Sequence, residues 1–147
     1  MEFITDRVPT PVGDFLVVSN GTQLCALDFE DYEERNLTLL KRYYGDVQLR
    51  PGRNPAGVCD QLRRYLDGDL EVLHEISIAT PGTPFQQQVW QALCKIPAGH
   101  TCSYGDLATA VGKPKASRAV GMANGANPIA VVVPCHRVIG ANGTLTG

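Results

Sequence analysis

The sequence contains no C-x-x-C pair, no apolar run long enough to cross a bilayer, and no basic leader followed by an apolar segment. Its five cysteines form an odd set without the spacing of a disulfide framework or a zinc ribbon. These absences argue against a membrane protein and against a fold held by disulfides or zinc. We therefore expect a cytoplasmic protein with reduced thiols and no metal.

Charge is sparse and unevenly placed. Charged residues make up 19% of the 147 residues and hydrophobic residues 44%, enough for one domain or two small subdomains with a buried core. Residues 1–81 hold eight Lys/Arg and fourteen Asp/Glu, a net charge of -6, whereas residues 82–147 hold five and one, a net charge of +4. The second part could therefore meet a polyanion, although ordinary solvated charge also explains the asymmetry.

Residues 1–81 have the pattern of a small α/β scaffold. Residues 15–19 and 23–29 are apolar-rich and flank Asn20-Gly21, a dipeptide that suits a hairpin turn with two positive φ angles. Helical spacing predicts a helix over residues 33–44 that ends at Gly45, and a second helix after Asn54-Pro55. The apolar side chains expected to face inward from that second helix are those of Val58, Leu62, Tyr65 and Leu66. Cys25 in a strand pattern and Cys59 in a helical one are expected in the core.

The composition changes at Thr80-Pro81-Gly82, which we take as the junction with a helical second subdomain, residues 82–147. Thr83 and Gln86 form a capping box with proline at the first helical position, and Trp90 on the same helix is expected in the core. Ser103 with Asp106 caps a short helix to about residue 111, and a third helix is predicted over residues 115–124. Two short helices joined by a turn with Gly and Pro fit a helix-turn-helix, although such pairs are common in proteins that bind no DNA.

The third predicted helix has an unusual composition. Small residues leave one of its surfaces nearly free of side chains, with Arg118 projecting; they are Ala116, Ser117, Ala119, Gly121, Ala123 and Gly125. Such a helix can approach a nucleic-acid groove closely, and tight packing against another helix is the alternative.

Residues 133–139 read Val-Pro-Cys-His-Arg-Val-Ile and follow an apolar run, residues 129–133, that we predict to be a strand. A thiolate is the nucleophilic form of cysteine, and a neighbouring histidine and cation favour it, so Cys135 is the candidate nucleophile. On an extended segment Cys135 and His136 would point to opposite faces, so a bridging water or a turn after Pro134 is required. Arg137 is as well explained by a surface or ion-paired role as by a catalytic one.

Together, these segments resemble those of the O6-alkylguanine-DNA alkyltransferases, also called methylated-DNA-protein-cysteine methyltransferases. The resemblance covers the whole sequence and is strongest in the segments at 83–86 with 89–90, 96–97, 103–105, 118–121 with 123–124, 127–128 and 134–139. It implies an α+β fold, in which an N-terminal α/β subdomain with a hairpin and an antiparallel sheet precedes a winged-helix-like subdomain with a helix-turn-helix. It also implies a protein that binds double-stranded DNA through the minor groove, extrudes O6-alkylguanine and needs no cofactor. Nothing in the sequence suggests an obligate protein partner, so a monomer is the default expectation.

The resemblance assigns roles to individual residues. Cys135 would accept the alkyl group irreversibly, His136 would draw off the thiol proton through water, and Asn127 would brace the reader helix against the active site. Arg118 would fill the space that the flipped base vacates, and Tyr104 would press on the neighbouring phosphate. The other residues expected at the DNA are Ser103, Ala119, Gly121 and Ala123, and those expected at the base pocket are Val138, Ala130 and Pro134. From the residues alone, Asn127 could be an ordinary Asn-Pro turn and Tyr104 a core tyrosine.

Family members continue past the position of Gly147 with a glycine-rich loop, a glutamate that orients the histidine, and a last helix. Without these, His136 would lack its usual carboxylate and the pocket would be open on one side. The leading expectation is a DNA repair protein that transfers the alkyl group of O6-alkylguanine, and also of O4-alkylthymine, to itself once. The alternatives are a lesion binder without catalysis, which Cys135 argues against, and a cysteine hydrolase, which would have no use for the Arg118 helix.

Overall fold

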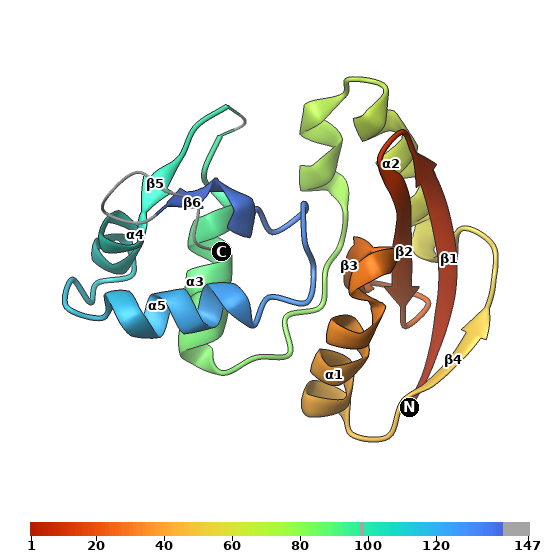
Figure 1. The fold of residues 1–147 in the computed structure, drawn as a ribbon, viewed down its shortest axis with the longest axis horizontal. Helices are drawn as coiled ribbons and strands as arrows, with labels where there is room; N and C mark the ends of the chain where they lie inside the picture. Colours follow the sequence, from red (N-terminus) through yellow and green to blue (C-terminus); the bar gives the residue numbers. More distant parts are fainter. Residues whose placement is uncertain (98, 140–147) are drawn as a thin grey trace. The chain divides into compact units, whose positions relative to one another are not determined.

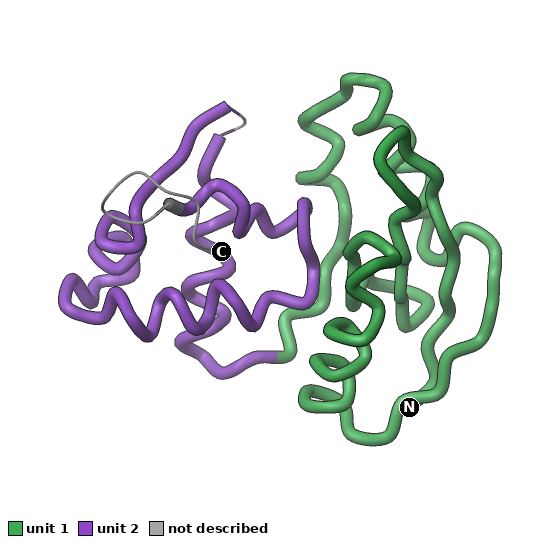
Figure 2. The backbone as a smooth tube through the Cα atoms, viewed as in Figure 1, with its two compact units in different colours: residues 1–81 green, residues 82–147 purple. Residues whose placement is uncertain are grey.

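The computed structural model describes residues 1–97 and 99–139. The chain divides into two compact units, Met1–Pro81 and Gly82–Gly147 (Figure 2). None of the helices in the described ranges is long and apolar enough to cross a membrane.

Unit 1 is a mixed sheet with helices (Figure 1). Its strands are β1 Glu2–Thr10, β2 Gly13–Ser19, β3 Leu24–Phe29 and β4 Gln48–Pro51, in the spatial order β3-β2-β1-β4. Its α-helices are α1 Glu33–Tyr44 and α2 Val58–Leu66, and its 3₁₀ turns are η1 Glu30–Tyr32, η2 Pro55–Gly57 and η3 Leu70–Glu75. Strands β1, β2 and β3 pair antiparallel, whereas β4 pairs parallel to β1.

The two α-helices of unit 1 cover opposite faces of the sheet. Leu40 of α1 packs in one cluster with Phe3 and Leu16, while Cys59 of α2 lies 3.5 Å from the carboxylate of Asp6. Phe3 and Asp6 are an odd number of residues apart on β1, so their side chains point to opposite faces. Cys25 and Cys59 are fully buried, which confirms that they are core residues.

Three details of unit 1 differ from the sequence predictions. Strand β1 was not foreseen, because Pro9 and the charged residues along it obscure the alternation. Of the Asn20-Gly21 pair only Gly21 has a positive φ; the Asn20 side chain instead accepts hydrogen bonds from the backbone N–H groups of Thr22 and Gln23 at 3.0 and 2.9 Å. Leu66 is 40% exposed because it is the last residue of α2, where the helix leaves the sheet.

Unit 2 is built on three helices. These are α3 Pro84–Cys94, α4 Tyr104–Ala110 and α5 Ser117–Gly125, and a short parallel pair joins β5 Cys102–Ser103 to β6 Val138–Ile139. The predicted capping boxes at Thr83 and Ser103 are both present, each with reciprocal side-chain and backbone hydrogen bonds. The observed α+β fold, with a sheet-containing first unit and a helical second unit, confirms the predicted class.

Trp90 is the centre of the packing in unit 2. Its side chain is 2% exposed, and its indole Nε1 donates a hydrogen bond of 2.9 Å to the carbonyl oxygen of Ala123. This bond fixes the middle of α3 to the last turn of α5, which confirms the expected core position of Trp90. A buried indole N–H needs such a partner, because burial without one is costly.

The predicted strand over residues 129–133 is wrong. Those residues form turns, Val131 has a φ of +70°, and the backbone N–H of Val133 bonds back to the carbonyl of Ile129 at 3.1 Å. A short apolar run does not distinguish a strand from a buried turn, and here side-chain hydrogen bonds from Asn127 select the turn.

Candidate functional site

Cys135 lies at the start of a single 3₁₀ turn, η4 Cys135–Arg137, that leads directly into β6. Its backbone N–H bonds to the carbonyl of Val133 at 2.8 Å, and that of Arg137 bonds to the carbonyl of Pro134 at 3.0 Å. The chain therefore turns after Pro134, and Cys135 and His136 are not on an extended segment. The Cys135 side chain is half-buried, which leaves part of it accessible.

Asn127 connects α5 to the turn that carries Cys135. The side chain is 1% exposed; its Nδ2 donates to the carbonyls of Val133 at 2.9 Å and Ile129 at 3.3 Å, and its Oδ1 accepts from the backbone N–H of Ile129 at 2.9 Å. Val133 in turn accepts from the N–H of Cys135. A path of two hydrogen bonds thus joins Asn127, just beyond α5, to the backbone of Cys135.

His136 is the exposed middle residue of η4. Desolvation by the surrounding protein, and then the positive charge of Arg137, lower the pKa of His136 below its ordinary value. A lowered pKa keeps the imidazole neutral at pH 7, the form that can accept a proton. The residue can therefore act as a base without first losing a proton of its own.

Arg137 has a structural partner. Its Nη1 donates a hydrogen bond of 2.7 Å to the carbonyl oxygen of Ile96, just beyond the end of α3. Its charge also lowers the pKa of the Cys94 thiol, although burial has the larger, opposing effect there. Arg137 thus ties η4 to the end of α3, a role that the sequence left undecided.

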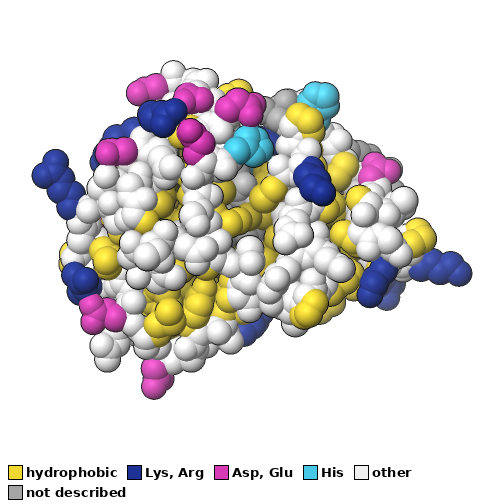
Figure 3. Space-filling view, turned by 180° about the vertical axis from the view of Figure 1, so that it is seen from behind, with side chains coloured by type: hydrophobic (Ala, Val, Ile, Leu, Met, Phe, Trp, Pro, Cys, Tyr) yellow, Lys and Arg dark blue, Asp and Glu magenta, His cyan; other side chains and the backbone are white. Residues whose placement is uncertain are grey.

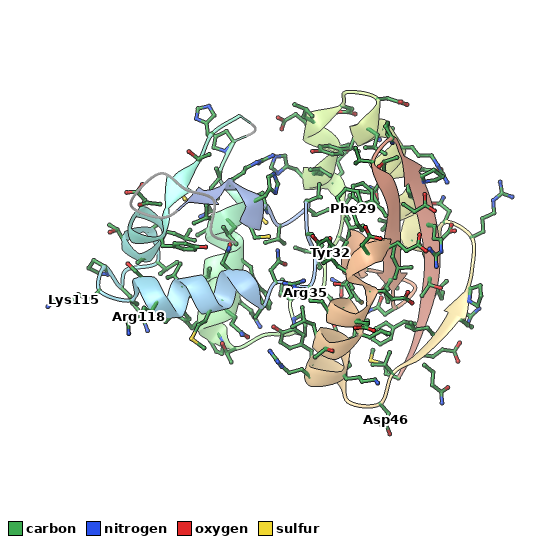
Figure 4. The ribbon with its side chains drawn as sticks, in the orientation of Figure 1. Phe29, Tyr32, Arg35, Asp46, Lys115 and Arg118 are labelled. Atoms are coloured by element: carbon green, nitrogen blue, oxygen red, sulfur yellow. The ribbon has the colours of Figure 1, made fainter. Side chains whose placement is uncertain are left out.

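The N-terminal part of α5 presents cations to solvent. Arg118 is exposed on its first turn, and Lys115 is exposed just before the helix; Figure 4 shows both pointing away from the body of unit 2. On the face drawn in Figure 3, most of the acidic side chains lie on unit 1, whereas Lys and Arg side chains are present on both units. The part of the charge asymmetry visible on this face is therefore the scarcity of acidic side chains on unit 2.

The small residues of α5 have different positions. Ala119 is exposed, whereas Gly121 is half-buried beside the ring of Tyr104, where an added Cβ would meet Cε1 at 3.8 Å. Ala123 is 2% exposed, so a direct DNA contact by its side chain is not supported; its small size lets α5 approach Trp90 instead. Ser103 uses its hydroxyl to cap α4, accepting from the N–H of Asp106 at 3.0 Å.

The residues expected at a base pocket lie near η4 in the chain. Val138 is fully buried in β6, Pro134 is buried directly before Cys135, and Ala130 is half-buried in the turn that Asn127 holds.

The family segments beyond Gly147, and residues 140–147, lie outside the described residues. Within the described ranges, no three His, Cys, Asp or Glu side chains cluster closely enough to hold a metal ion.

Two residues of α5, Met122 and Asn124, have no individual role in the sequence predictions. Asn124 is 2% exposed, and its Oδ1 has no hydrogen-bond partner among the described residues. Met122 is a large apolar side chain that is 78% exposed. Helical spacing gives the signal for Met122, since it lies four residues after Arg118; nothing in the sequence pattern distinguishes Asn124 from a polar surface residue.

The other cysteines offer no comparable site. All five cysteines lie in the described part of the chain, and none forms a disulfide. Burial, and next the negative charge of Asp6, raise the pKa of Cys59 to about 12, and burial also raises the pKa values of Cys25, Cys94 and Cys102. At neutral pH these four remain protonated and weakly nucleophilic.

Comparison with known proteins matches both units of the chain. The family profile described as "6-O-methylguanine DNA methyltransferase, DNA binding domain" matches residues 84–147, and "6-O-methylguanine DNA methyltransferase, ribonuclease-like domain" matches residues 6–80. The methylated-DNA--protein-cysteine methyltransferase of Salmonella typhimurium is 47% identical, over 100% of this chain and 88% of that protein.

Two solved structures from Mycobacterium tuberculosis have similar folds. Its O6-methylguanine methyltransferase has a TM-score of 0.75 at 39% identity, covering 99% of this chain and 82% of that one. Its OGT in complex with DNA has a TM-score of 0.77 at 38% identity, covering 100% and 83%.

Proposed function

This chain belongs to the 6-O-methylguanine DNA methyltransferase family, and on that premise we propose that it repairs alkylated DNA by moving the alkyl group of O6-alkylguanine onto the sulfur of Cys135. The observation that carries the proposal is the turn Cys135–Arg137, held by Asn127 and Arg137 next to a neutral His136. O4-alkylthymine is a second substrate of the same chemistry. The protein acts as a monomer.

The transfer is a single displacement. The Cys135 thiol loses its proton through a water molecule to His136, and the sulfur attacks the alkyl carbon attached to the guanine oxygen. The new S–C bond forms as the C–O bond breaks, and the electron pair of that bond stays with the guanine, which takes up one proton. Thiol and alkylguanine thus become thioether and guanine with no net gain or loss of protons. Because a thiolate leaves poorly from the alkyl carbon of a neutral thioether, the cysteine is not regenerated and each molecule reacts once.

The lesion has to leave the duplex before Cys135 can reach it, because the alkyl group is inside the base stack. We assign the DNA contact to the exposed face of α5, entering the minor groove, with Arg118 filling the space that the base vacates. Tyr104 and Ser103, at the start of α4, contact the phosphate beside the target nucleotide. The exposed Lys115 and Arg118, the match of residues 84–147 to a DNA binding domain, and the DNA complex of the M. tuberculosis relative support the assignment of DNA binding to unit 2.

Serine substitutions at two cysteines test the proposal. Cys135→Ser is expected to abolish alkyl transfer while leaving binding to a duplex with O6-methylguanine unchanged. The matched control is Cys94→Ser, whose half-buried thiol lies in the same unit but has a raised pKa. Transfer retained by Cys135→Ser, or lost equally in Cys94→Ser, would contradict the assignment of Cys135.

The second candidate is a lesion-binding protein without catalysis. It predicts that the wild-type chain binds the duplex and remains unmodified. The partial exposure of Cys135 favours transfer, because a pure binding protein needs no accessible thiol in this turn.

A further inference from the structure

We propose that Met122 is a DNA-contacting residue that inserts its apolar side chain into the minor groove beside Arg118, against the sugar faces of the duplex. The proposal rests on the proposed function, since it assumes that α5 is the helix that meets DNA. The other exposed long side chains on and next to α5 are cationic. Met122 would add an uncharged contact, whose contribution to the binding free energy does not depend on salt.

The two faces of α5 are sharply different. The inner face consists of Val120, Ala123 and Asn124, all buried, and it is fixed to α3 by the hydrogen bond between Trp90 and Ala123. That bond sets the rotation of the helix about its axis. The opposite face is therefore the one available to a partner.

Met122 and Arg118 share this outer face. They are four residues apart, so their side chains leave the helix about 5–6 Å from each other. Ala119, also exposed, lies one turn before Met122 and adds almost no bulk. Any surface that Arg118 enters from α5 must consequently also meet the side chain of Met122.

The chemistry of Met122 suits the minor groove. A methionine side chain is unbranched and adapts to irregular apolar surfaces, and minor-groove proteins commonly use apolar side chains as wedges between or beside base steps. With 78% of its surface exposed, Met122 contributes little to the packing of unit 2. Its apolar area leaves water only when a partner covers it.

Three variants separate this role from electrostatic and structural ones. Met122→Ala should lower affinity for a duplex with O6-methylguanine about five- to tenfold, since it removes three heavy atoms that become partly buried on binding. Met122→Leu should restore most of that loss, because leucine has a similar volume. Val12→Ala is the matched control, because Val12 is an exposed apolar residue of unit 1 with 81% of its surface accessible; it should change nothing.

The salt dependence of binding separates loss of an apolar contact from loss of a charge. Met122→Ala should lower affinity at every salt concentration without changing the slope of log K against log salt, because it removes no charge. Lys115→Ala, which removes an exposed cation next to α5, should reduce that slope by about 1.

Transfer from free O6-benzylguanine distinguishes the possible outcomes. If Met122→Ala lowers affinity for the duplex, leaves transfer from the free base unchanged and does not change the slope of log K against log salt, the proposal is supported. Unchanged duplex affinity of Met122→Ala would overturn it, and so would an equal loss on the free base, since that points to a disturbed pocket. If the wild-type protein neither binds duplex nor reacts with either substrate, the proposed function fails, and this proposal fails with it.

Discussion

Replacing Asn127 with alanine removes the side chain that connects α5 to the turn before Cys135. The backbone N–H of Ile129 loses the Oδ1 acceptor at 2.9 Å, and a buried donor without a partner costs about 1–3 kcal/mol. The carbonyls of Ile129 and Val133 each lose one bond but keep another, from the N–H groups of Val133 and Cys135. These two losses add roughly 0.5–1 kcal/mol each, so we expect Asn127→Ala to destabilise unit 2 by about 2–5 kcal/mol.

Asn124 provides a matched control on the same segment. It is buried to the same degree, but its Oδ1 has no partner among the described residues. Asn124→Ala therefore removes an unsatisfied acceptor and leaves only a small cavity, so the two effects oppose each other. Its free energy of unfolding should stay within about 1 kcal/mol of the wild-type value.

The unfolding of unit 2 can be followed by the fluorescence of Trp90. This residue is the only tryptophan of the chain and is 2% exposed at the centre of unit 2, so its fluorescence in a urea titration reports the unfolding of this unit. The free energies of the two variants are compared at equal m values. Equal losses for Asn127→Ala and Asn124→Ala, or a loss below about 0.5 kcal/mol for Asn127→Ala, would refute the reasoning from these hydrogen bonds.

Two further predictions concern the reaction, and a third concerns the stability of unit 2. Arg118→Ala should slow transfer from duplex DNA at least tenfold more than transfer from free O6-benzylguanine, because only the duplex requires base flipping; equal losses in rate assays would remove Arg118 from that role. Burial and the charge of Arg137 lower the pKa of His136, so the acidic fall of the transfer rate should lie at a lower pH than the ordinary titration of a histidine. His136→Ala should lower the rate and abolish this acidic limb of the pH profile. Arg137→Ala should destabilise unit 2 by about 1–2 kcal/mol through loss of the bond to Ile96, measured by Trp90 fluorescence, and an unchanged midpoint would contradict that role.

Local signals in the sequence predicted the local features of this structure. The capping boxes at Thr83 and Ser103 were predictable because the bonding residues lie three positions apart. Helix α1, Glu33–Tyr44, has the predicted bounds, and Gly45 follows it with a φ of +76°. Each of these features depends on neighbours within one helical turn.

Features that depend on distant residues were not predictable in the same way. Strand β4 pairs with β1 across more than forty residues, and β5 and β6 are two residues each, too short for a periodic pattern. The turn at residues 129–133 reads as a strand because its residues are apolar and mostly β-branched. The chain folds back there through side-chain hydrogen bonds of Asn127 and the backbone bond from Val133 to Ile129, which an apolar pattern does not indicate.

The candidate site shows the same division. The heptapeptide around Cys135 identified a nucleophile and a base, but not the 3₁₀ turn that carries them. The bond from Arg137 to Ile96 joins residues 41 positions apart, so no spacing rule could have indicated it. Ala119 is exposed and Ala123 is buried because of which face of α5 meets Trp90. From composition alone, both residues were assigned to one surface of small residues.

Transfer of the alkyl group to Cys135 is tested by mass spectrometry of the protein after incubation with a duplex that carries one O6-methylguanine. We expect the intact protein to gain the mass of one methyl group, peptide mapping to place this group on Cys135, and a second addition of substrate to produce no further change. A protein that binds the duplex but remains unmodified, or that carries the methyl group on another cysteine, would show that Cys135 is not the alkyl acceptor.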